Sequence, residues 1–314
     1  MSSDDVDAAL LELITHLHFL DYRFITPTPE THRRVLARKA GAVARDLRDV
    51  FGWNLPFAPA LLPVPLFERL ASLGILRDHA GLNKSRVRVS SVGDRLFLHS
   101  AFPTSQKDAV FFGPDSYRFA RFLEAELAGA PETHRLVDIG AGAGVGAIAA
   151  AALVPHARLT LTDINPLALR YAAINACHAG LDVELVEGNG MDPVVGSFDL
   201  AITNPPFIVD SQQRTYRHGG DMHGGALSLQ WALAAARMVA PGGRVLLYTG
   251  SAIVDGADGL KAALRECLPG LGCSLRYTEL DPDIFGEQLD EPGYEDVERI
   301  AAVGAVIQRQ PPTV

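Results

Sequence analysis

The stretch Val137–Gly146, which reads VDIGAGAGVG, decides the fold. It begins within an apolar run expected to form a strand (Leu136–Ile139), and an alanine-rich helical segment follows at 145–154. Glycines at such a junction let the backbone turn tightly and approach a ligand where a Cβ would clash. The free N–H groups of the helix N-terminus are directed at the same space. The unit therefore predicts a ligand at the strand end. Which ligand is open, because Gly142–Ala147 also satisfies the G-x-G-x-x-A dinucleotide pattern. The alternative to any ligand is a purely structural turn between strand and helix.

Outward from this unit, short apolar strands alternate with helical segments. Further strands are expected at Leu159–Thr162, Val183–Val186, Leu200–Thr203, Arg244–Tyr248, Ser274–Leu280 and Ile300–Gln308, and further helices at 166–179, 225–240 and 257–267. Strands separated by helices predict a parallel sheet with helices on both faces. The last two strands follow each other without a helix and predict an antiparallel pair at the sheet edge. The expected class is α/β, a doubly wound, seven-stranded, mostly parallel sheet with an antiparallel edge strand.

The N-terminal part has a different pattern. Helices are expected at 5–20, 29–50 and 65–76, and the strands Val87–Ser90 and Arg95–His99 flank turn residues typical of a β-hairpin. We therefore expect two domains: residues 1–110 as a helical domain with a hairpin, for substrate recognition or as a lid, and residues 111–314 as the catalytic domain. A basic cluster on or beside the hairpin is interpreted as a solvated face. Its members are Lys84, Arg86, Arg88 and Arg95.

Composition and charge narrow the class of protein. An apolar fraction of 48% with 21% charged residues is that of an ordinary soluble globular chain. The sequence contains no run of about 18 apolar residues, which is the length that a membrane helix needs. The acidic N-terminus does not resemble a signal peptide. The three cysteines have no metal-ligand spacing, so we expect reduced thiols, no metal and a cytoplasmic location.

Charge is unevenly divided along the chain. Residues 1–115 carry 14 Lys/Arg and 13 Asp/Glu, a net charge of +1, so residues 116–314 carry 14 Lys/Arg and 24 Asp/Glu, a net charge of -10. An acidic catalytic domain repels polyphosphate. Any contact with nucleic acid is therefore expected to come through the N-terminal part.

Polar residues at the ends of the second and third strands extend the ligand site. Asp163 is placed to accept hydrogen bonds from both hydroxyls of a ribose, although it could instead cap the helix that begins near Pro166. After the third strand, Asn189 or the Gly190 backbone N–H is placed to meet an adenine, and Met191 packs either on that ring or in the core. These positions predict a nucleoside ligand.

Asp138 indicates which nucleoside. An acid two residues before the first glycine is unfavourable beside a pyrophosphate, whereas it suits a cofactor with cationic ammonium and sulfonium groups.

The segment Asn204–Phe207, N-P-P-F, follows the fourth strand at the same sheet edge. The Asn204 carbonyl and the Pro205 backbone carbonyl can both accept hydrogen bonds from one –NH₂ group, and Pro206 helps to fix the backbone. Holding both protons would orient the nitrogen lone pair for attack, and Phe207 offers a face for a planar group. The segment predicts a planar amine or amide acceptor, against the alternative of a proline-rich strand exit.

Taken together, the motifs in residues 134–250 resemble the class I S-adenosylmethionine-dependent methyltransferases, in particular the small-domain amino-methyltransferases with an N-P-P-[FY] motif. That resemblance implies S-adenosylmethionine as cofactor, and Asn204, Pro205, Pro206 and Phe207 as the catalytic segment. The candidate cofactor-binding residues are Asp138, Gly140, Gly142, Gly144, Asp163, Ile164, Asn189, Gly190 and Asn204.

Two further segments are similar to the release-factor glutamine methyltransferases. Phe112–Ser116 resembles the segment by which those enzymes close over the cofactor, and Arg217–Gly225 resembles their glycine-rich loop. Two features depart from them: Phe207 stands where they usually carry Tyr, and residues 1–110 do not match their helical domain. The leading hypothesis is a macromolecular acceptor, either a glutamine of a translation protein or an exocyclic base amine of RNA. The acidic catalytic domain slightly favours protein, and the basic hairpin allows RNA.

Other functions remain open. They are methylation of a small metabolite, an NAD-binding oxidoreductase or nucleotide-sensing module, and a binding protein with a decayed site. His218 and His223 flank the expected site, but this chemistry needs no general base of that kind. The acidic stretch Asp281–Glu298 is interpreted as a solvated loop that could alternatively recognise a basic partner.

Overall fold

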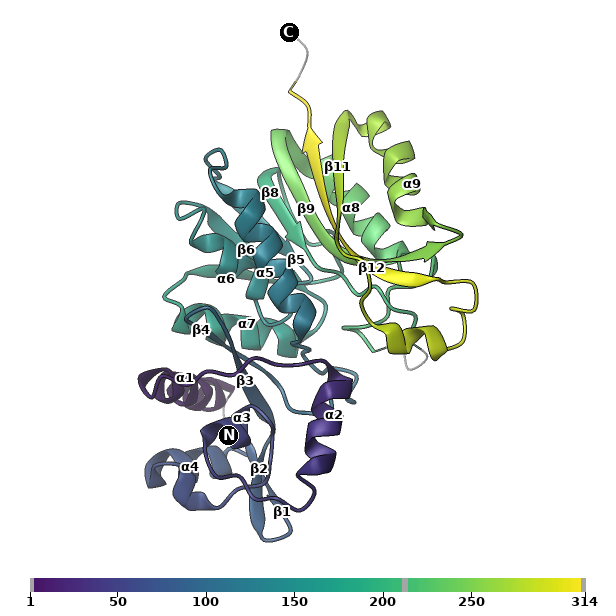
Figure 1. The fold of residues 1–314 in the computed structure, drawn as a ribbon. Helices are drawn as coiled ribbons and strands as arrows, with labels where there is room; N and C mark the ends of the chain where they lie inside the picture. The colour runs from purple at the N-terminus through teal and green to yellow at the C-terminus, as the bar shows by residue number, and fades with distance from the viewer. Residues whose placement is uncertain (1–2, 211–213, 312–314) are drawn as a thin grey trace.

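A twisted sheet of eight strands forms the centre of the protein in the computed structural model, which describes residues 3–210 and 214–311. The strand order is β11-β12-β9-β8-β5-β6-β7, with the short β10 paired to β9 (Figure 1). The strands are β5 (Arg135–Ile139), β6 (Arg158–Asp163), β7 (Val183–Glu187), β8 (Phe198–Thr203), β9 (Val239–Val254), β10 (Ala257–Asp258), β11 (Cys273–Asp281) and β12 (Arg299–Arg309). The pairs from β9 through β8, β5 and β6 to β7 are parallel, whereas β12 is antiparallel to both β9 and β11. The predicted α/β class and its seven strands are confirmed, and the antiparallel strand lies one position in from the edge.

Helices cover both faces of the sheet. They are α5 (Pro114–Leu127), α6 (Val145–Ala151), α7 (Pro166–His178), α8 (Ala226–Met238) and α9 (Gly259–Cys267), with short 3₁₀ turns at Pro269–Leu271 and Gly286–Asp290. Successive residues of a strand point to opposite faces. Accordingly Leu136 packs in the cluster that contains α5 and α6 side chains, and its neighbour Val137 packs in the cluster of α8 and α9. Both faces of β5 are therefore buried, as expected of a central parallel strand.

The N-terminal module consists of short helices and two hairpins. Its elements are α1 (Ser3–Phe19), α2 (Pro29–Arg38), α3 (Leu47–Phe51), a 3₁₀ turn (Pro59–Leu61), α4 (Val64–Ser72), β1 (Leu76–His79), β2 (Leu82–Ser85), β3 (Val87–Val92) and β4 (Arg95–Ser100). The hairpin β3–β4 confirms the predicted one. The single helix predicted over 29–50 is wrong, because Gly41 adopts a positive φ and Asp46 caps a new helix by accepting from the Asp49 N–H. The hairpin β1–β2 was not predicted.

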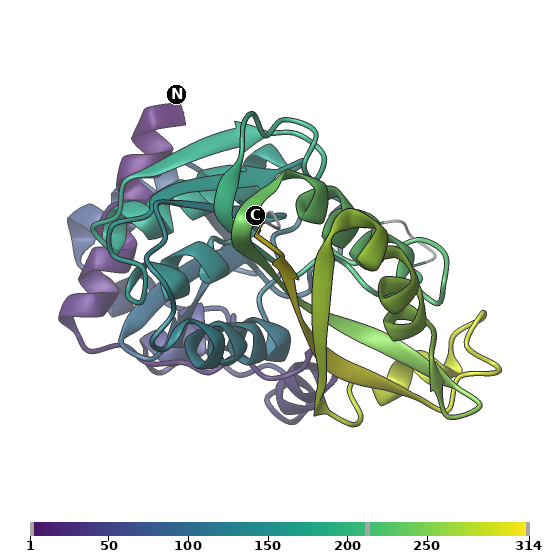
Figure 2. The same cartoon turned by 90° about the horizontal axis from the view of Figure 1, so that it is seen from above.

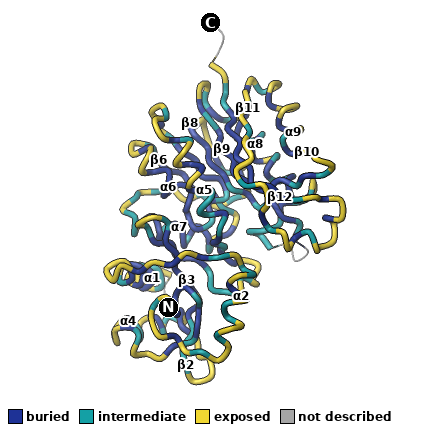
Figure 3. Tube along the Cα trace, in the orientation of Figure 1, coloured by how far each residue is buried: buried dark blue, intermediate teal, exposed yellow. Residues whose placement is uncertain are grey.

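The N-terminal module is attached to α7 of the sheet domain. Asn175 of α7 accepts from the Leu98 N–H at 2.8 Å and donates to the Leu98 carbonyl at 3.1 Å, and Arg170 pairs with Asp7 of α1. Figure 2 shows α1, in purple, beside the teal part of the chain and far from its yellow C-terminal end. One cluster of buried side chains runs from α1 to α7 across this contact (Figure 3). The domain division at residue 110 stays a prediction.

The basic cluster of the hairpin region is not one solvated face. Arg88 is 3% exposed, donates to the Gly52 carbonyl at 2.8 Å and to Thr26 Oγ1 at 3.2 Å, and stacks on Phe24. Burial lowers the pKa of Arg88 to about 10. The sequence interpretation was wrong for this residue, because the segments around residues 24 and 52 cover the Arg88 side chain.

Candidate functional site

A cavity of about 430 Å³ lies at the carboxyl ends of the central parallel strands. Eleven of the twelve candidate site residues line it: Asp138, Gly140, Gly142, Asp163, Ile164, Asn189, Gly190, Asn204, Pro205, Pro206 and Phe207. The twelfth, Gly144, is not among its lining residues and packs instead against Ala172 of α7. The sheet thus brings together side chains from the ends of β5, β6, β7 and β8. The roles assigned to them stay predictions.

Two carboxylates mark one half of the cavity. Asp163, at the end of β6, accepts from the Gly142 N–H and the Asn165 N–H, both at 2.9 Å. Asn165, and not Asp163, caps α7 by accepting from the Leu167 N–H at 3.0 Å. The alternative capping role of Asp163 is therefore wrong, and each of its oxygens keeps a lone pair for a ligand hydroxyl.

Asp138 is the more deeply buried of the two, with 1% exposed. It accepts from the Ala147 N–H at 2.8 Å, a bond that ties the end of β5 to the first turn of α6. Burial raises the pKa of Asp138 to about 7, and the nearby charge of Asp163 acts in the same direction. Burial also raises the pKa of Asp163. Both groups would gain from a cationic ligand, because it would offset the cost of their desolvation.

Trp231 of α8 is a wall of this half of the cavity that the sequence analysis missed. A Cβ on Gly140 would lie 2.5 Å from the Trp231 ring, and a Cβ on Gly190 would lie 2.6 Å from its Nε1. Both glycines have a positive φ as well, so two loops at the ends of different strands rest on one indole and require glycine there. Trp231 is 8% exposed, and among the described residues its Nε1 has no hydrogen-bond partner. No local signal marks it, because it stands in a helix that is apolar on several sides.

Met191, by contrast, packs with Trp231 and Phe198 in the core between the sheet and α8, and it does not line the cavity. Of the two fates considered for it, the core is the one observed.

The opposite half of the cavity is formed by Asn204–Phe207. No hydrogen bond joins the Asn204 side-chain amide to any residue in the described part of the chain, and the residue lines the cavity. Its neighbour Thr203 is fully buried and donates to the Ile139 carbonyl at 2.9 Å, which fixes the end of β8 against β5. The amide is therefore free to bind a ligand on a rigid strand end.

Phe207 packs over β9. A Cβ on Gly250 would lie 2.4 Å from the Phe207 ring, and Phe285 contacts that ring edge-on at 5.7 Å. The glycine-rich loop lies against the backbone of the same segment, since a Cβ on Gly219 would lie 2.6 Å from the Pro206 carbonyl and one on Gly224 would lie 2.3 Å from the Phe207 carbonyl. These close approaches explain why glycine is required at positions 219 and 224 of the glycine-rich loop: a larger residue would clash with the backbone of Asn204–Phe207.

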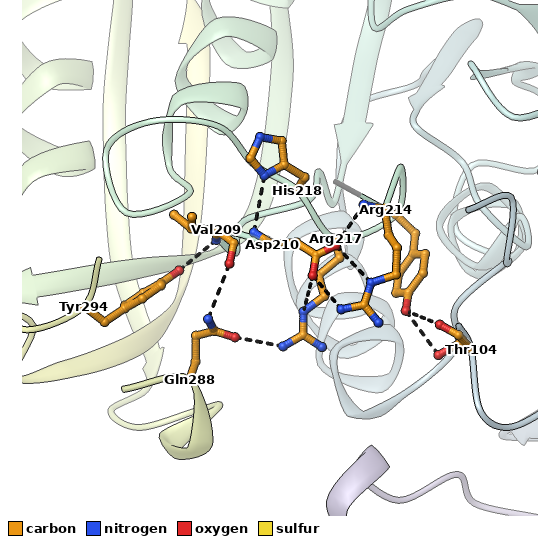
Figure 4. Close-up of polar contacts among 9 residues, drawn as sticks. Thr104, Val209, Asp210, Arg214, Arg217, His218, Gln288 and Tyr294 are labelled. Atoms are coloured by element: carbon orange, nitrogen blue, oxygen red, sulfur yellow. Dashed lines mark hydrogen bonds and ion pairs between the residues drawn. The ribbon is translucent and has the colours of Figure 1, made fainter. Parts of the chain in front are cut away.

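The loop after this segment is held by contacts from three parts of the chain (Figure 4). Asp210, 5% exposed, accepts from Arg214 Nε at 2.9 Å and from its Nη2 at 2.5 Å. Tyr216 donates to the Thr104 carbonyl at 2.7 Å, in the segment that leads out of the N-terminal module. Arg217 donates to Gln288 Oε1 at 2.8 Å, near the C-terminal end. The acceptor side of the cavity is thus assembled from residues far apart in sequence.

The acidic stretch Asp281–Glu298 is not simply a solvated loop. Tyr294 is 1% exposed and donates to the His223 carbonyl at 3.1 Å, while its hydroxyl accepts from the Val209 N–H at 2.9 Å. Gln288 is 2% exposed, and Phe285 lines the cavity. Apolar and amide side chains between the acidic ones therefore pack against the site, which the charge pattern concealed.

The two histidines of the glycine-rich region have different positions. His218 lines the cavity, and its Nδ1 accepts from the Asp210 N–H at 3.3 Å. His223 pairs with Asp296 at 3.0 Å and is not a lining residue. Neither contact amounts to a catalytic role.

No group of three or more His, Cys, Asp or Glu residues is arranged to hold a metal ion within residues 3–210 and 214–311. Over the same ranges no helix has the length and apolar character needed to cross a membrane.

The comparisons with known proteins concern mainly the middle of the chain. Residues 110–226 match the family described as the methyltransferase small domain. A release factor glutamine methyltransferase of Deinococcus radiodurans is 36% identical over 126 residues, which are 37% of this chain and 45% of that protein. A ribosomal RNA small subunit methyltransferase C of Hahella chejuensis is 35% identical over 126 residues, 40% of this chain and 34% of that protein. The chain therefore spans less than half the length of these curated relatives.

Among solved structures, a Pyrococcus horikoshii protein is similar with a TM-score of 0.50 and 11% identity, over 78% of this chain and 82% of that one. This likeness shows a shared fold.

Proposed function

We propose that this chain, which belongs to the methyltransferase small-domain family through residues 110–226, transfers a methyl group from S-adenosylmethionine to a planar –NH₂ nitrogen of a macromolecule. The observation that carries the proposal is the free amide of Asn204, which shares one cavity with the carboxylates of Asp138 and Asp163. One half of that cavity suits a cationic nucleoside, and the other half suits a neutral amine.

The residues of the first half fit this cofactor. Asp163 has free lone pairs for ribose hydroxyls, and Asn189 and the Gly190 loop lie beside Trp231, where a flat purine has an aromatic neighbour. Asp138 is a buried carboxylate near the glycine loop, where it favours an ammonium or sulfonium group and disfavours a pyrophosphate. This argues against the NAD-binding alternative.

The acceptor half supplies positioning. S-adenosylmethionine, when bound, offers a sulfonium methyl group: the acceptor nitrogen forms the new N–C bond, the C–S pair goes to sulfur, and one N–H proton is lost to solvent. The Asn204 side-chain carbonyl and the Pro205 carbonyl would accept from the two N–H groups. Their partial negative charges would stabilise the positive charge that develops on nitrogen. Phe207 would flank the planar group with its ring.

The macromolecular nature of the acceptor is supported by the relatives, whose names give a translation release factor and ribosomal RNA as the molecules modified. The test is transfer of radiolabelled methyl groups from S-adenosylmethionine into a fractionated cell lysate. We expect label in high-molecular-weight material that becomes soluble with either protease or ribonuclease. Label that resists both treatments would contradict a protein or RNA acceptor.

A further inference from the structure

A second cavity of about 300 Å³ adjoins the acceptor half of the first. Its walls come from α2 and residues 102–105 of the N-terminal module, from residues 214–217, and from Glu287. Both cavities are lined by Pro29, Phe111, Arg214, Tyr216 and Arg217. The first cavity would be largely filled by a cofactor and one acceptor amine, so the remainder of a macromolecular acceptor has to leave through an opening of this kind.

The walls of the second cavity bring arginines of α2 and of residues 214–217 together, in a chain of net charge -9. Helix α2 carries three arginines and one glutamate over Pro29–Arg38. That glutamate, Glu30, accepts from Arg33 at 2.7 Å and from Arg34 at 2.6 Å, so it is already neutralised. Among the lining residues, the arginines 33, 214 and 217 outnumber Glu30 and Glu287. Asp210 pairs with Arg214 behind this wall and lies 4.0 Å from Arg217 Nε, so the acids and arginines here balance and what the wall offers a ligand is guanidinium donors.

Arg214 and Arg217 are held in place and still have donors to offer. Asp210 binds Arg214 through Nε and Nη2, and Gln288 binds Arg217 through Nη2. Over residues 3–210 and 214–311, no hydrogen bond involves Nη1 of either arginine. Figure 4 shows both guanidinium groups beside the Asp210 carboxylate. Guanidinium groups fixed by a buried acid in this way are well suited to phosphate oxygens.

An aromatic pair stands at the junction of the two cavities. The rings of Phe111 and Tyr216 are stacked with 5.5 Å between centroids and an interplanar angle of 6°. Arg214 lies over the Tyr216 ring at 5.8 Å. Flat aromatic surfaces next to arginines are the usual elements by which proteins bind unpaired bases and their backbone.

We propose that the second cavity binds the strand of an RNA acceptor next to the base whose amine reaches Asn204. A phosphate would lie against Arg214 and Arg217, and a neighbouring base against Phe111 or Tyr216. The inference rests on the proposed function, because it names the acceptor of the same site. The RNA has to be single-stranded or looped there, since a base inside a duplex cannot enter a cavity. A neutral glutamine-bearing peptide would bring no phosphate oxygen to the Nη1 groups of Arg214 and Arg217.

Binding of a fluorescein-labelled single-stranded RNA of about ten nucleotides tests the inference. Fluorescence anisotropy is measured with the full chain saturated with S-adenosylhomocysteine, over a series of salt concentrations. We expect wild-type protein to bind, and Arg217→Gln and Arg33→Gln each to weaken binding on the order of tenfold and to lower the salt slope by about one. Arg276→Gln is the matched control, an exposed arginine of β11 that also pairs with a glutamate and should bind like wild type.

The thermal unfolding midpoint, the cofactor affinity and the binding of a glutamine-containing peptide are measured on the same samples. Together they distinguish failure of this inference from failure of the proposed function. The cofactor affinity of Arg217→Gln should equal that of wild type, and its thermal unfolding midpoint should fall only slightly, because the Arg217–Gln288 hydrogen bond is lost while the Asp210–Arg214 pair is retained. If wild-type protein binds the cofactor but not the RNA, or if Arg217→Gln binds RNA as wild type does, the inference is overturned. Preferential binding of a labelled glutamine-containing peptide would also overturn it. Absence of cofactor binding in wild-type protein would instead refute the proposed function.

Discussion

The two halves of the main cavity are built in different ways. The cofactor half consists of short segments at the ends of adjacent strands, and backbone N–H groups hold its carboxylates Asp138 and Asp163. The acceptor half starts from Asn204 in the same manner, but Tyr216 and Gln288 join it to the N-terminal module and to the C-terminal end. The shape of the cofactor half therefore depends on local backbone geometry, whereas the shape of the acceptor half depends on the packing of three distant parts of the chain. Four substitutions test this division, beginning with the largest expected effect.

Asn204→Ala should have the largest effect on turnover while leaving the function of the cofactor half intact. We expect kcat to fall by about 10²–10³, because one acceptor of the amine protons is lost, and cofactor affinity to remain. Radiolabel transfer measures the first and calorimetry the second. Asn189→Ala is the matched control in the cofactor half, where the loss should appear in affinity and not in kcat at saturation. Equal loss of cofactor binding in Asn204→Ala would show that the halves are not separable.

Gly190→Ala should damage the cofactor half. A Cβ there would lie 2.6 Å from Trp231 Nε1, and the residue has a φ of +55°. Gly242→Ala is the control for backbone strain alone, since it has a φ of +82° and nothing within 4 Å of the added Cβ. We expect a cost of about 1 kcal/mol in unfolding free energy for Gly242→Ala and a larger one for Gly190→Ala, together with at least about tenfold weaker cofactor binding. Equal behaviour of the two variants would contradict the role of Trp231 as a shared wall.

Asp138→Asn should change how stability depends on pH. Burial raises the folded-state pKa of Asp138 from 3.8 to about 7, so the folded protein holds this proton more tightly than the unfolded chain. The wild-type contribution is therefore favourable at low pH and is lost as pH rises between these two values. At pH 8 the ligand-free Asn variant should be more stable by ~1–2 kcal/mol, and the difference should shrink toward pH 4.

Chemical denaturation across that pH range measures the effect. The same variant should bind the cofactor less tightly, because the carboxylate charge opposite its ammonium is lost. A variant that is both less stable at pH 8 and unaltered in affinity would contradict the placement of Asp138.

Tyr216→Phe should produce the smallest effect and confine it to the acceptor half. It removes the hydrogen bond to the Thr104 carbonyl but keeps the ring stacked on Phe111. We expect a cost of about 0.5–1.5 kcal/mol, a several-fold rise in the KM for the acceptor, and unchanged cofactor affinity. Steady-state kinetics with both substrates varied give the answer. A rise in the KM for the cofactor instead would show that this loop supports both halves.

Much of this architecture could be read from local sequence. The alternation of apolar strands and helices predicted a mostly parallel sheet with helices on both faces, and because the carboxyl ends of parallel strands meet at one edge, Asp163 and Asn204 line the same cavity. The helix expected over 29–50 failed because its apolar pattern continues through a break set by Gly41 and Asp46. The prediction of a solvated Arg88 was wrong because charge alone does not reveal that other segments of the chain cover this side chain.

The sequence by itself determined the class of fold and the set of short motifs at its strand ends, since a tight turn, a strand end and an N-P-P-F segment are properties of neighbouring residues. Only the tertiary structure decided that Trp231 contacts two glycine loops. The tertiary structure likewise decided that Gln288 and Tyr294, which belong to an acidic stretch, form hydrogen bonds with the acceptor loop. It also decided that α2 faces residues 214–217 across a second cavity. The physical reason is that such contacts join residues tens to hundreds of positions apart, and no local pattern of charge or hydrophobicity encodes which distant segment a side chain will meet.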